Sequence, residues 1–557
     1  MISKIRLVFL CFIFSANVFA IEQALPSKAA IASAHPVASR AGFEVLEKGG
    51  NAFDAAVAVS ATLAVVEPYS SGLGGGGFWL LHEKKTNKDI MVDGREKAPL
   101  KASRNMYEDK NGNVIANLSV DGALAAGIPG EVAALVHIAK NYGRLPLKES
   151  LAPAIAAAEQ GFVVTEHYRR MAKFRLKVLL KSKAATKIFL HDNKVPGLGY
   201  VIKQPALAKT LRIIARDGHK GFYAGEIAHQ LVKGNNRAGG IWSLRDLKQY
   251  QVKERQPIVS HYRGYKITSV APPSSGGVAL TEMLNILSFY NIEELSASNR
   301  VHVTVEAMRR AYRDRAEFLG DSDFIKVPVK KLSSKKYAEA LRQTIDFEKA
   351  TLSSSLKGVA DTSGGNHTTH FSILDKQGNR VAGTLSVNYP FGSCFVAPGT
   401  GVLLNDEMDD FSAKPGVPNV YGLVGAEANA IAPGKRMLSS MSPTFIESEN
   451  KLAIIGTPGG SRIITMVLHG ILAVIEGKTA QQVVDLPRYH HQYLPDVIQY
   501  EPGAFSAEEL IKLRELGHHL KKLDNTYGNM QLVIWNKKDN LVSAASDRRG
   551  EGEAIVK

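Results

Sequence analysis

The sequence predicts a layered α+β fold. Strand-like segments lie near the N-terminus and again after residue 368, and the chain between them carries the long helical patterns. The segment 52–66 is rich in Ala and Val and has no charge between Asp54 and Glu67, so we expect a helix buried between layers. Hydrophobic residues make up 45% of the 557 residues and charged residues 22%, which is typical of a soluble globular protein and excludes disordered and collagen-like classes.

The elements have recognisable start and stop signals. Asn51 can cap the buried helix, and Ser506 with Glu509 forms a capping box for a late one. In the first half we expect a strand at 28–35, a helix from Pro36 to Gly49, a helix at 52–66, a glycine loop at 72–77, strands at 78–82 and 90–93, and helical patterns at 122–222, 276–290 and 301–319. In the second half we expect strands at 369–375, 380–387 and 451–456, and helices at 463–476 and 507–516.

The N-terminus predicts export. Lys4 and Arg6 precede a short apolar run, and Ala20 ends a segment that resembles a signal-peptide cleavage site, so residues 1–20 are expected to be removed. The apolar run is too short to span a bilayer, and an uncleaved anchor is the alternative. We expect a periplasmic protein, with a secreted form as the alternative. The remaining chain keeps only Cys394, which predicts no internal disulfide and a small buried side chain.

The net charge of +16 does not point to nucleic acid. Lys and Arg are scattered along the chain, and no stretch interleaves them with aromatic residues as a nucleic-acid groove would. The glycine loop 72–77 is not a dinucleotide fingerprint, because a helix precedes it and a strand follows it; a closely packed structural loop is expected. His469, His490 and His491 lack the spacing of metal ligands on one helix face, so they are expected to be structural or surface residues.

A sharper signal is His367-Thr368-Thr369-His370, where a Ser- and Gly-rich segment ends and a strand begins. Residues 346–366 are expected to form an exposed, mobile connection. A threonine inside a chain is a poor nucleophile. If the preceding peptide bond breaks, the new α-amine has a pKa near ~8 and can deprotonate the hydroxyl of its own residue.

Six motifs then occur in order and together resemble the γ-glutamyltranspeptidase family over nearly all of the chain after the signal. They are SGLGGGGF (71–78), DGRE (93–96), TTHFS (368–372), NDEMDDFS (405–412), SSMSPT (439–444) and PGGSRI (458–463). The resemblance implies a four-layer αββα sandwich of the N-terminal-nucleophile hydrolase type, made as one precursor. It also implies autocatalytic cleavage between His367 and Thr368, giving a large subunit (21–367) and a small subunit (368–557) that remain a heterodimer.

The resemblance implies a role for each matching residue. Thr368 would attack the γ-glutamyl amide, Ser386 would hydrogen-bond to it, and the amides of Gly459 and Gly460 would hold the oxyanion. Further residues would bind the α-amino and α-carboxylate groups of the donor. Arg95, Ser439 and Ser440 match the carboxylate side, and Asn388, Glu407 and Asp410 the ammonium side. Glu407 is Gln in some relatives, and a second carboxylate is expected to bind the ammonium more strongly.

The segment 415–422 resembles the lid of many family members, with Tyr421 as its gate. The expected partners are glutathione and other γ-glutamyl compounds as donors, and water, amino acids or dipeptides as acceptors. No cofactor or metal is required by this chemistry. Two alternatives remain at this point: a glutaryl-cephalosporin-type acylase, against which Glu407 and Asp410 argue, and a non-catalytic exported binding protein.

Overall fold

The computed structural model describes residues 24–356, 368–414, 416, 417, 419, 423 and 425–557. The predicted signal segment 1–20, His367 and the gate Tyr421 therefore lie outside the described residues. None of the helices in the described ranges is both long and apolar enough to cross a membrane.

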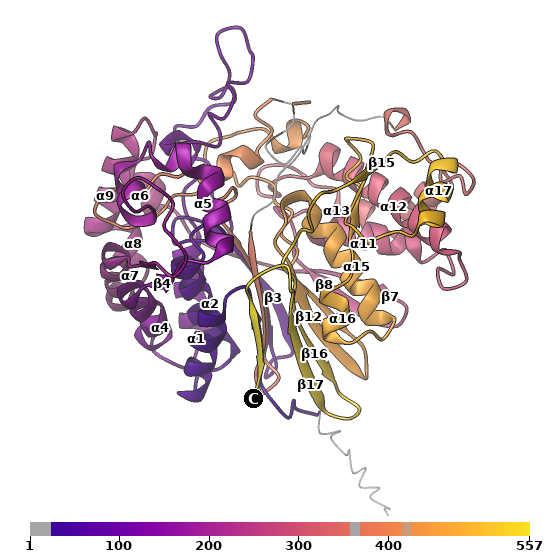
Figure 1. Ribbon diagram of the computed structural model, residues 1–557, viewed down its shortest axis with the longest axis horizontal. Coiled ribbons are helices and arrows are strands. Elements are labelled where there is room, and N and C mark those ends of the chain that lie inside the picture. Colours follow the sequence, from indigo (N-terminus) through magenta and orange to yellow (C-terminus); the bar gives the residue numbers. More distant parts are fainter. Residues whose placement is uncertain (1–23, 357–367, 415, 418, 420–422, 424) are drawn as a thin grey trace, which may run out of the picture.

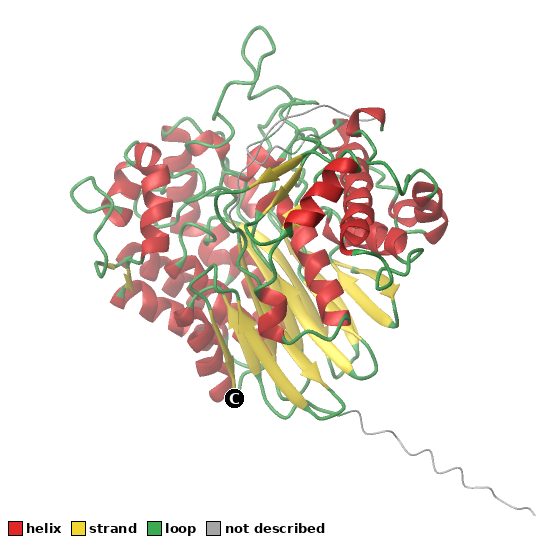
Figure 2. Ribbon diagram, turned by 45° about the vertical axis from the view of Figure 1, so that its right-hand side comes forward, coloured by secondary structure: helices red, strands yellow, loops and turns green. Residues whose placement is uncertain are grey.

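Two antiparallel sheets stack face to face between two groups of helices, which confirms the predicted four-layer sandwich (Figures 1 and 2). The first sheet has the order β18 (Glu553–Val556), β1 (Ala30–Ser33), β9 (Thr369–Leu374), β10 (Arg380–Ser386), β2 (Gly76–Glu83), β3 (Lys88–Gly94), β6 (Lys253–Arg255). The second has the order β17 (Leu541–Ser546), β16 (Gln531–Asn536), β12 (Lys451–Gly456), β11 (Thr444–Glu447), β8 (Tyr265–Ser269), β7 (Ile258–Tyr262). Strands from both sides of residue 368 thus share each sheet.

The helices divide between the two outer layers. On the side of the first sheet lie α1 (Pro36–Glu47), α2 (Ala52–Val66), α3 (Glu131–Asn141), α4 (Leu147–Gln160), α5 (Glu166–Leu179), α6 (Lys183–Phe189), α7 (Pro205–Asp217), α8 (His219–Tyr223), α9 (Gly225–Arg237) and α10 (Leu244–Lys248). On the side of the second lie α11 (Gly276–Leu287), α12 (Ala297–Phe318), α13 (Val329–Leu332), α14 (Lys335–Arg342), α15 (Ile463–Ile475), α16 (Ala480–Val484) and α17 (Ala507–Glu515). Two small sheets, β4 (Phe162–Val163) with β5 (Val201–Ile202), and β13 (Tyr489–His490) with β14 (Ile498–Tyr500) and β15 (Leu520–Lys522), complete the fold.

The core forms two main clusters because strand side chains alternate between the faces of a sheet. Phe371 and Ile373 of β9 pack with the helices of the first layer, whereas Leu374 and Ala382 belong to the core between the sheets. All residues of α2 are buried, as the absence of charge after Asp54 predicts. Its cap is also confirmed, since the Asn51 side chain accepts hydrogen bonds from the amides of Phe53 (2.9 Å) and Asp54 (3.1 Å).

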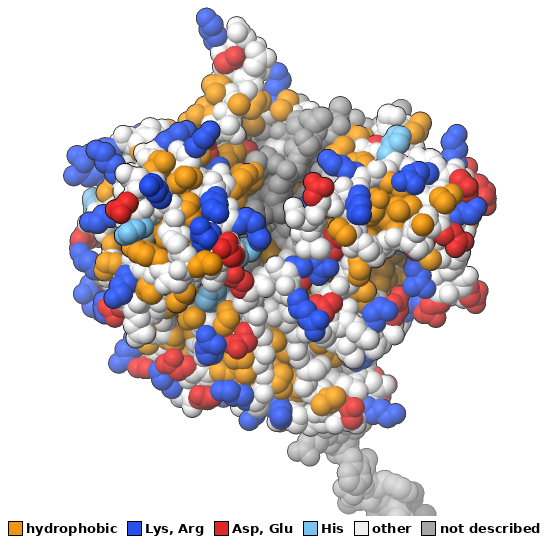
Figure 3. Space-filling view, viewed as in Figure 1, with side chains coloured by type: hydrophobic (Ala, Val, Ile, Leu, Met, Phe, Trp, Pro, Cys, Tyr) orange, Lys and Arg blue, Asp and Glu red, His pale blue; other side chains and the backbone are white. Residues whose placement is uncertain are grey.

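Cys394 is buried, as expected. On the face in Figure 3, Lys and Arg side chains are spread over both halves.

The described part of the connection, 346–356, is exposed at most of its residues, as predicted, but it is anchored to the body of the protein at a few points. Ser353 is fully buried, and its amide donates to Asp496 Oδ2 (2.7 Å). The amide of Thr351 donates to Glu306 Oε1 (3.1 Å), and the Tyr493 hydroxyl donates to the carbonyl of Leu356 (3.0 Å). These anchors come from α12 and from the loop around residue 495, so a composition argument on the segment alone could not find them.

Candidate functional site

Thr368 lies immediately before β9, in the middle of the first sheet. Alternation along the strand places Thr368 on the same face as His370, toward the second sheet. The second sheet approaches closely here, since a Cβ on Gly456 of β12 would lie 2.3 Å from the His370 ring. Thr369 points to the other face, where its hydroxyl donates to Glu67 Oε2 at 2.7 Å. Thr368 therefore faces the loop that follows β12.

The register between β9 and β10 places Ser386 beside Thr368. Thr369 pairs with Leu385, so the next pair along the ladder is Thr368 with Ser386. The Ser386 hydroxyl accepts a hydrogen bond from the amide of Asn388 at 2.7 Å, and Asn388 has a left-handed backbone (φ 76°). The Asn388 side chain donates to the carbonyl of Asp406 (3.1 Å), which ties the end of β10 to the acidic segment.

The glycine loop supports this arrangement by close backbone packing. A Cβ on Gly75 would lie 2.1 Å from the carbonyl oxygen of Ser386, and one on Gly74 would lie 2.1 Å from that of Leu403. Only glycine allows these approaches. The structural interpretation of the loop is confirmed.

Gly459 and Gly460 form the turn between β12 and α15. Both have positive φ, 146° and 55°, and α15 begins three residues after Gly460. Their amides lie just before a helix N-terminus, where negative charge is stabilised. The hydroxyl of Tyr312 in α12 donates to the carbonyl of Ser461, and this hydrogen bond connects the turn to α12.

A buried charge cluster lies next to Ser386. Arg95 is 1% exposed and forms ion pairs with Glu407 and Asp410, and a longer one with Glu96 (3.4 Å). Burial raises the pKa of Glu407 to about 7, although Arg95 opposes the shift. Burial also disfavours the charge of Arg95, but Glu407 and Asp410 outweigh it and raise the pKa of Arg95. The cluster thus places one cation and more than one acid in a largely buried site.

Ser439 and Ser440 form the opposite wall. The Ser439 hydroxyl accepts from the amide of Met441 (3.1 Å), and the Ser440 hydroxyl accepts from Arg315 Nη2 (3.2 Å). Arg315 lies on α12 and is buried, and burial lowers its pKa. Sequence analysis missed Arg315 and Tyr312, because α12 carries many charged residues and no local signal marks these two positions.

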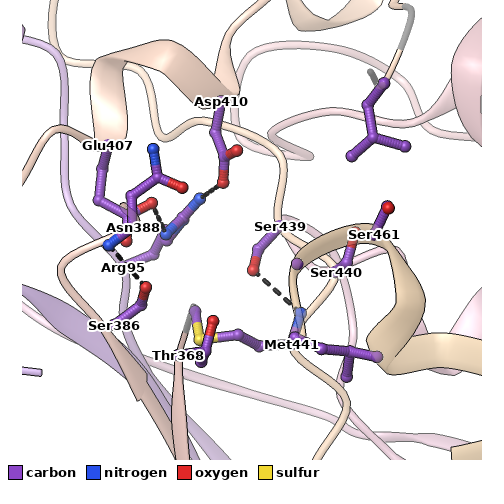
Figure 4. A pocket seen from close by; sticks show the side chains of 13 residues that line it. Arg95, Thr368, Ser386, Asn388, Glu407, Asp410, Ser439, Ser440, Met441 and Ser461 are labelled. Atoms are coloured by element: carbon purple, nitrogen blue, oxygen red, sulfur yellow. Dashed lines mark hydrogen bonds and ion pairs between the residues drawn. The ribbon is translucent and has the colours of Figure 1, made fainter. Parts of the chain in front are cut away.

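Figure 4 shows how these residues surround one cavity. The charge cluster lies on one side, Ser439 and Ser440 on the other, and Thr368 with Ser386 at the base. The lining consists of Arg95, Thr368, Ser386, Asn388, Glu407, Asp410, Leu423, Ser439, Ser440, Met441, Gly460, Ser461 and Ile463. Every described residue of the predicted site is in this set except Gly459, which adjoins it.

The three histidines His469, His490 and His491 have structural contacts. His469 Nε2 donates to the carbonyl of Tyr489 (2.8 Å), and His490 and His491 are buried and hydrogen-bonded. Elsewhere in the described chain, side-chain atoms of His302, Glu306 and His518 converge within 4.8 Å. Both oxygens of Glu306 are paired with arginines of the same helix, Arg309 and Arg310, which opposes a cation there.

The chain is similar over most of its length to known proteins of one family. The γ-glutamyltranspeptidase family pattern matches residues 38–557. A glutathione hydrolase proenzyme of Pseudomonas sp. (strain A14) is 45% identical over 483 residues, 86% of this chain and 84% of that protein. The γ-glutamyltranspeptidase structure from Helicobacter pylori is 43% identical with a TM-score of 0.58, covering 60% of this chain and 96% of that one. A cephalosporin acylase from Bacillus halodurans is 27% identical with a TM-score of 0.84, covering 98% of this chain and 99% of that one. This chain belongs to the γ-glutamyltranspeptidase family.

Proposed function

We propose that the protein is a γ-glutamyltransferase and glutathione hydrolase that matures by autoproteolysis and uses Thr368 as its nucleophile. The observation that carries the proposal is a single cavity in which a threonine at the start of a central strand lies near a buried Arg95, the buried carboxylate of Glu407 and the partly exposed carboxylate of Asp410. Such a cavity suits a donor that carries both an α-carboxylate and an α-ammonium group next to the bond to be cut.

On binding, the charged groups of the donor replace the ion pairs within the cluster. The donor α-carboxylate binds the planar guanidinium of Arg95 and accepts hydrogen bonds from the hydroxyls of Ser439 and Ser440. Its ammonium binds Glu407 and Asp410, the two acids that pair with Arg95. Asn388 lies beside them and adds a polar side chain.

In the acylation step, the free α-amine of Thr368 acts as the general base. The amine accepts the hydroxyl proton, and Oγ bonds to the γ-carbonyl carbon. The oxyanion lies against the amides of Gly459 and Gly460. The C–N bond breaks, and the leaving amine takes the proton. Water or an amine then attacks the ester and releases Oγ. Ser386 orients the nucleophile by a hydrogen bond.

Maturation cuts the His367–Thr368 bond and gives subunits 21–367 and 368–557. Their shared sheets support a stable heterodimer, because β9, β10 and β18 of the small subunit lie between or beside strands of the large one. The contacts of Ser353 with Asp496 and of Leu356 with Tyr493 add polar links between the subunits. We place the enzyme in the periplasm, after removal of residues 1–20.

The direct test uses glutathione. The purified mature protein is expected to release glutamate and cysteinylglycine, measured by liquid chromatography. A matched glutaryl amide, which lacks the α-amino group, is expected to react about a hundredfold more slowly in kcat/KM, because Glu407 and Asp410 then face no cation. Equal or faster cleavage of the glutaryl amide would favour the acylase activity instead.

The Glu407 carboxyl makes donor binding depend on pH. With its pKa near 7, it is neutral below that pH and ionised above it, so its attraction for the donor ammonium appears as pH rises. The donor KM is expected to fall about tenfold from pH 6 to pH 8. Glu407→Gln should show a flat KM, close to the wild-type value at pH 6. The glutaryl amide is the control, since its KM should not improve with pH. A variant with the wild-type pH profile would rule out this role.

A further inference from the structure

The segment 162–203, which contains β4, α5, α6 and β5, carries a large share of the positive charge. It has ten Lys and Arg but only two acids, so its net charge of +8 is half of the +16 of the whole chain. Two of its arginines are neutralised. Arg169 pairs with Glu166 at 3.0 Å, and Arg175 pairs with Asp121 at 2.9 Å. All seven lysines of the segment are exposed, and none of them forms an ion pair with a described residue.

The same segment also exposes apolar side chains. Sixteen large hydrophobic side chains are exposed in the described part of the chain, and six of them lie between residues 163 and 201. The most exposed of the six are Phe174 (59%) on α5 and Leu198 (58%) in the loop before β5. The other four are Val163, Leu180, Tyr200 and Val201. Positive charge and exposed apolar surface are therefore concentrated together in less than a tenth of the chain.

The helical period brings these two kinds of side chain to one face of α5. Lys173, Phe174 and Lys177 are three or four residues apart or adjacent, so they share one side of the helix. The other side is buried and includes Met171 and Leu179. Figure 3 shows Lys and Arg side chains interspersed with hydrophobic ones over α5 and α6.

The neighbouring elements extend this surface. The amide of Val164 donates to the carbonyl of Tyr200 at 2.8 Å, which holds the end of the loop before β5 next to the start of α5. The ring of His191, just after α6, lies 4.8 Å from the ring of Tyr200. We name the exposed lysines and apolar side chains of residues 162–203 the α5–α6 face.

We propose that the α5–α6 face binds the surface of an anionic phospholipid bilayer, with its lysines at the headgroups and Phe174 and Leu198 at the boundary with the acyl chains. A bilayer offers negative charge and hydrocarbon over one broad surface, which fits a face of this composition. Four of the six apolar side chains are aliphatic, so they cannot stack on bases as a nucleic-acid site requires. The inference does not depend on the proposed catalytic function.

The first test is sedimentation of the mature protein with lipid vesicles at low salt. The wild type is expected to bind vesicles of phosphatidylcholine with phosphatidylglycerol at least about tenfold more tightly than vesicles of phosphatidylcholine alone. The triple variant Lys173→Gln, Lys177→Gln, Lys181→Gln should bind the anionic vesicles at least about tenfold more weakly than the wild type, because each lysine near the leaflet adds attraction.

The matched control removes the same charge from another part of the surface. Lys512, Lys521 and Lys522 are exposed lysines of α17 and β15, which lie on the side of the second sheet. Their exchange for Gln should weaken binding less than about twofold, because charges far from the leaflet are screened. An equal loss in both triple variants would show that net charge alone drives binding, and it would overturn the proposal.

The apolar contribution is tested by Phe174→Gln combined with Leu198→Gln. This variant should bind anionic vesicles about tenfold more weakly, because it can no longer bury two large apolar side chains. The control is Ile511→Gln with Leu541→Gln, whose side chains are similarly exposed (55% and 61%). It should bind as the wild type does. Full binding by the Phe174 and Leu198 variant would indicate a purely electrostatic site, which soluble polyaspartate would fill equally well, and it would overturn insertion into a bilayer.

Phe174→Trp reports insertion directly. The native tryptophans Trp79, Trp242 and Trp535 are all buried, so an indole at position 174 is the one that can enter the lipid. Its fluorescence emission should shift to shorter wavelength with anionic vesicles and stay unchanged with neutral ones. No shift on either kind of vesicle, or equal sedimentation of the wild type with both, would overturn the proposal.

Glutathione hydrolysis keeps these outcomes separate from the proposed function. Each variant should hydrolyse glutathione within about twofold of the wild type, because exposed substitutions rarely disturb folding and none of these residues lines the donor cavity of Figure 4. Arg170 is left unchanged throughout, since it lines a neighbouring cavity of about 480 Å³ together with Glu67 and Thr368. Loss of vesicle binding with hydrolysis retained therefore reports on the α5–α6 face alone.

Discussion

Thr368→Ala is expected to remain a single chain and to lose hydrolysis by at least about a thousandfold, because it removes the hydroxyl needed for both self-cleavage and acylation. The wild type is expected to separate on a denaturing gel into chains of about 38 and about 21 kDa, from scaling 60.4 kDa by subunit length. The smaller chain should begin at Thr368, which N-terminal sequencing reads directly.

Two further variants test the position of the nucleophile. Thr368→Ser keeps a hydroxyl and should be cut, with reduced activity. Thr369→Val removes the neighbouring hydroxyl, which contacts Glu67 instead of the donor cavity, and should still be cut before Thr368. An active, two-chain Thr368→Ala enzyme would disprove the assignment, and so would a small chain that begins elsewhere.

Arg95→Lys is expected to lower kcat/KM for γ-glutamyl donors by about a hundredfold or more. Lysine keeps the charge but loses the planar fork that binds a carboxylate through two hydrogen bonds. Retaining the charge matters for folding, because Arg95 forms ion pairs with three acids. Removing one partner of a buried ion pair lowers the free energy of unfolding by about 3–5 kcal/mol. Two chains on the gel would show that the variant folds and matures.

The specific readout is a donor whose α-carboxylate is replaced by a carboxamide. The wild type should strongly prefer the free acid, and Arg95→Lys should lose most of that preference. Arg104→Lys is the matched control, since Arg104 forms a surface ion pair with Glu427 outside the donor cavity. An unchanged preference in Arg95→Lys would show that Arg95 does not hold the carboxylate.

Local patterns in the sequence determined much of the fold. Helix α2 begins and ends where its cap and apolar run predict, and β12 has the predicted bounds. The hairpin of β9 and β10 follows from β-branched residues around a polar turn. These signals are readable because capping, periodicity and turn chemistry act between residues a few positions apart.

The chemistry that we propose for Thr368 was also accessible from the sequence, because an N-terminal amine is the base that a threonine nucleophile needs. The motif resemblance implied the other site residues, and the structure brings the described ones to one place. The hydrogen-bond and ion-pair partners of these residues could not be predicted from the sequence. The contact of Arg95 with Glu407 joins residues 312 positions apart, and no periodic pattern encodes it.

Only the tertiary structure decided what surrounds the nucleophile. Arg315 supports Ser440 from a helix in another layer, and the mostly exposed connection 346–356 is anchored through Ser353, which its composition does not predict. The cavity with Glu67 and Arg170 arises where α2 and α5 meet the loop after β12. Such features depend on how separate layers pack at one edge of the two sheets, and burial and charge pairing there are set by residues that are distant in the chain.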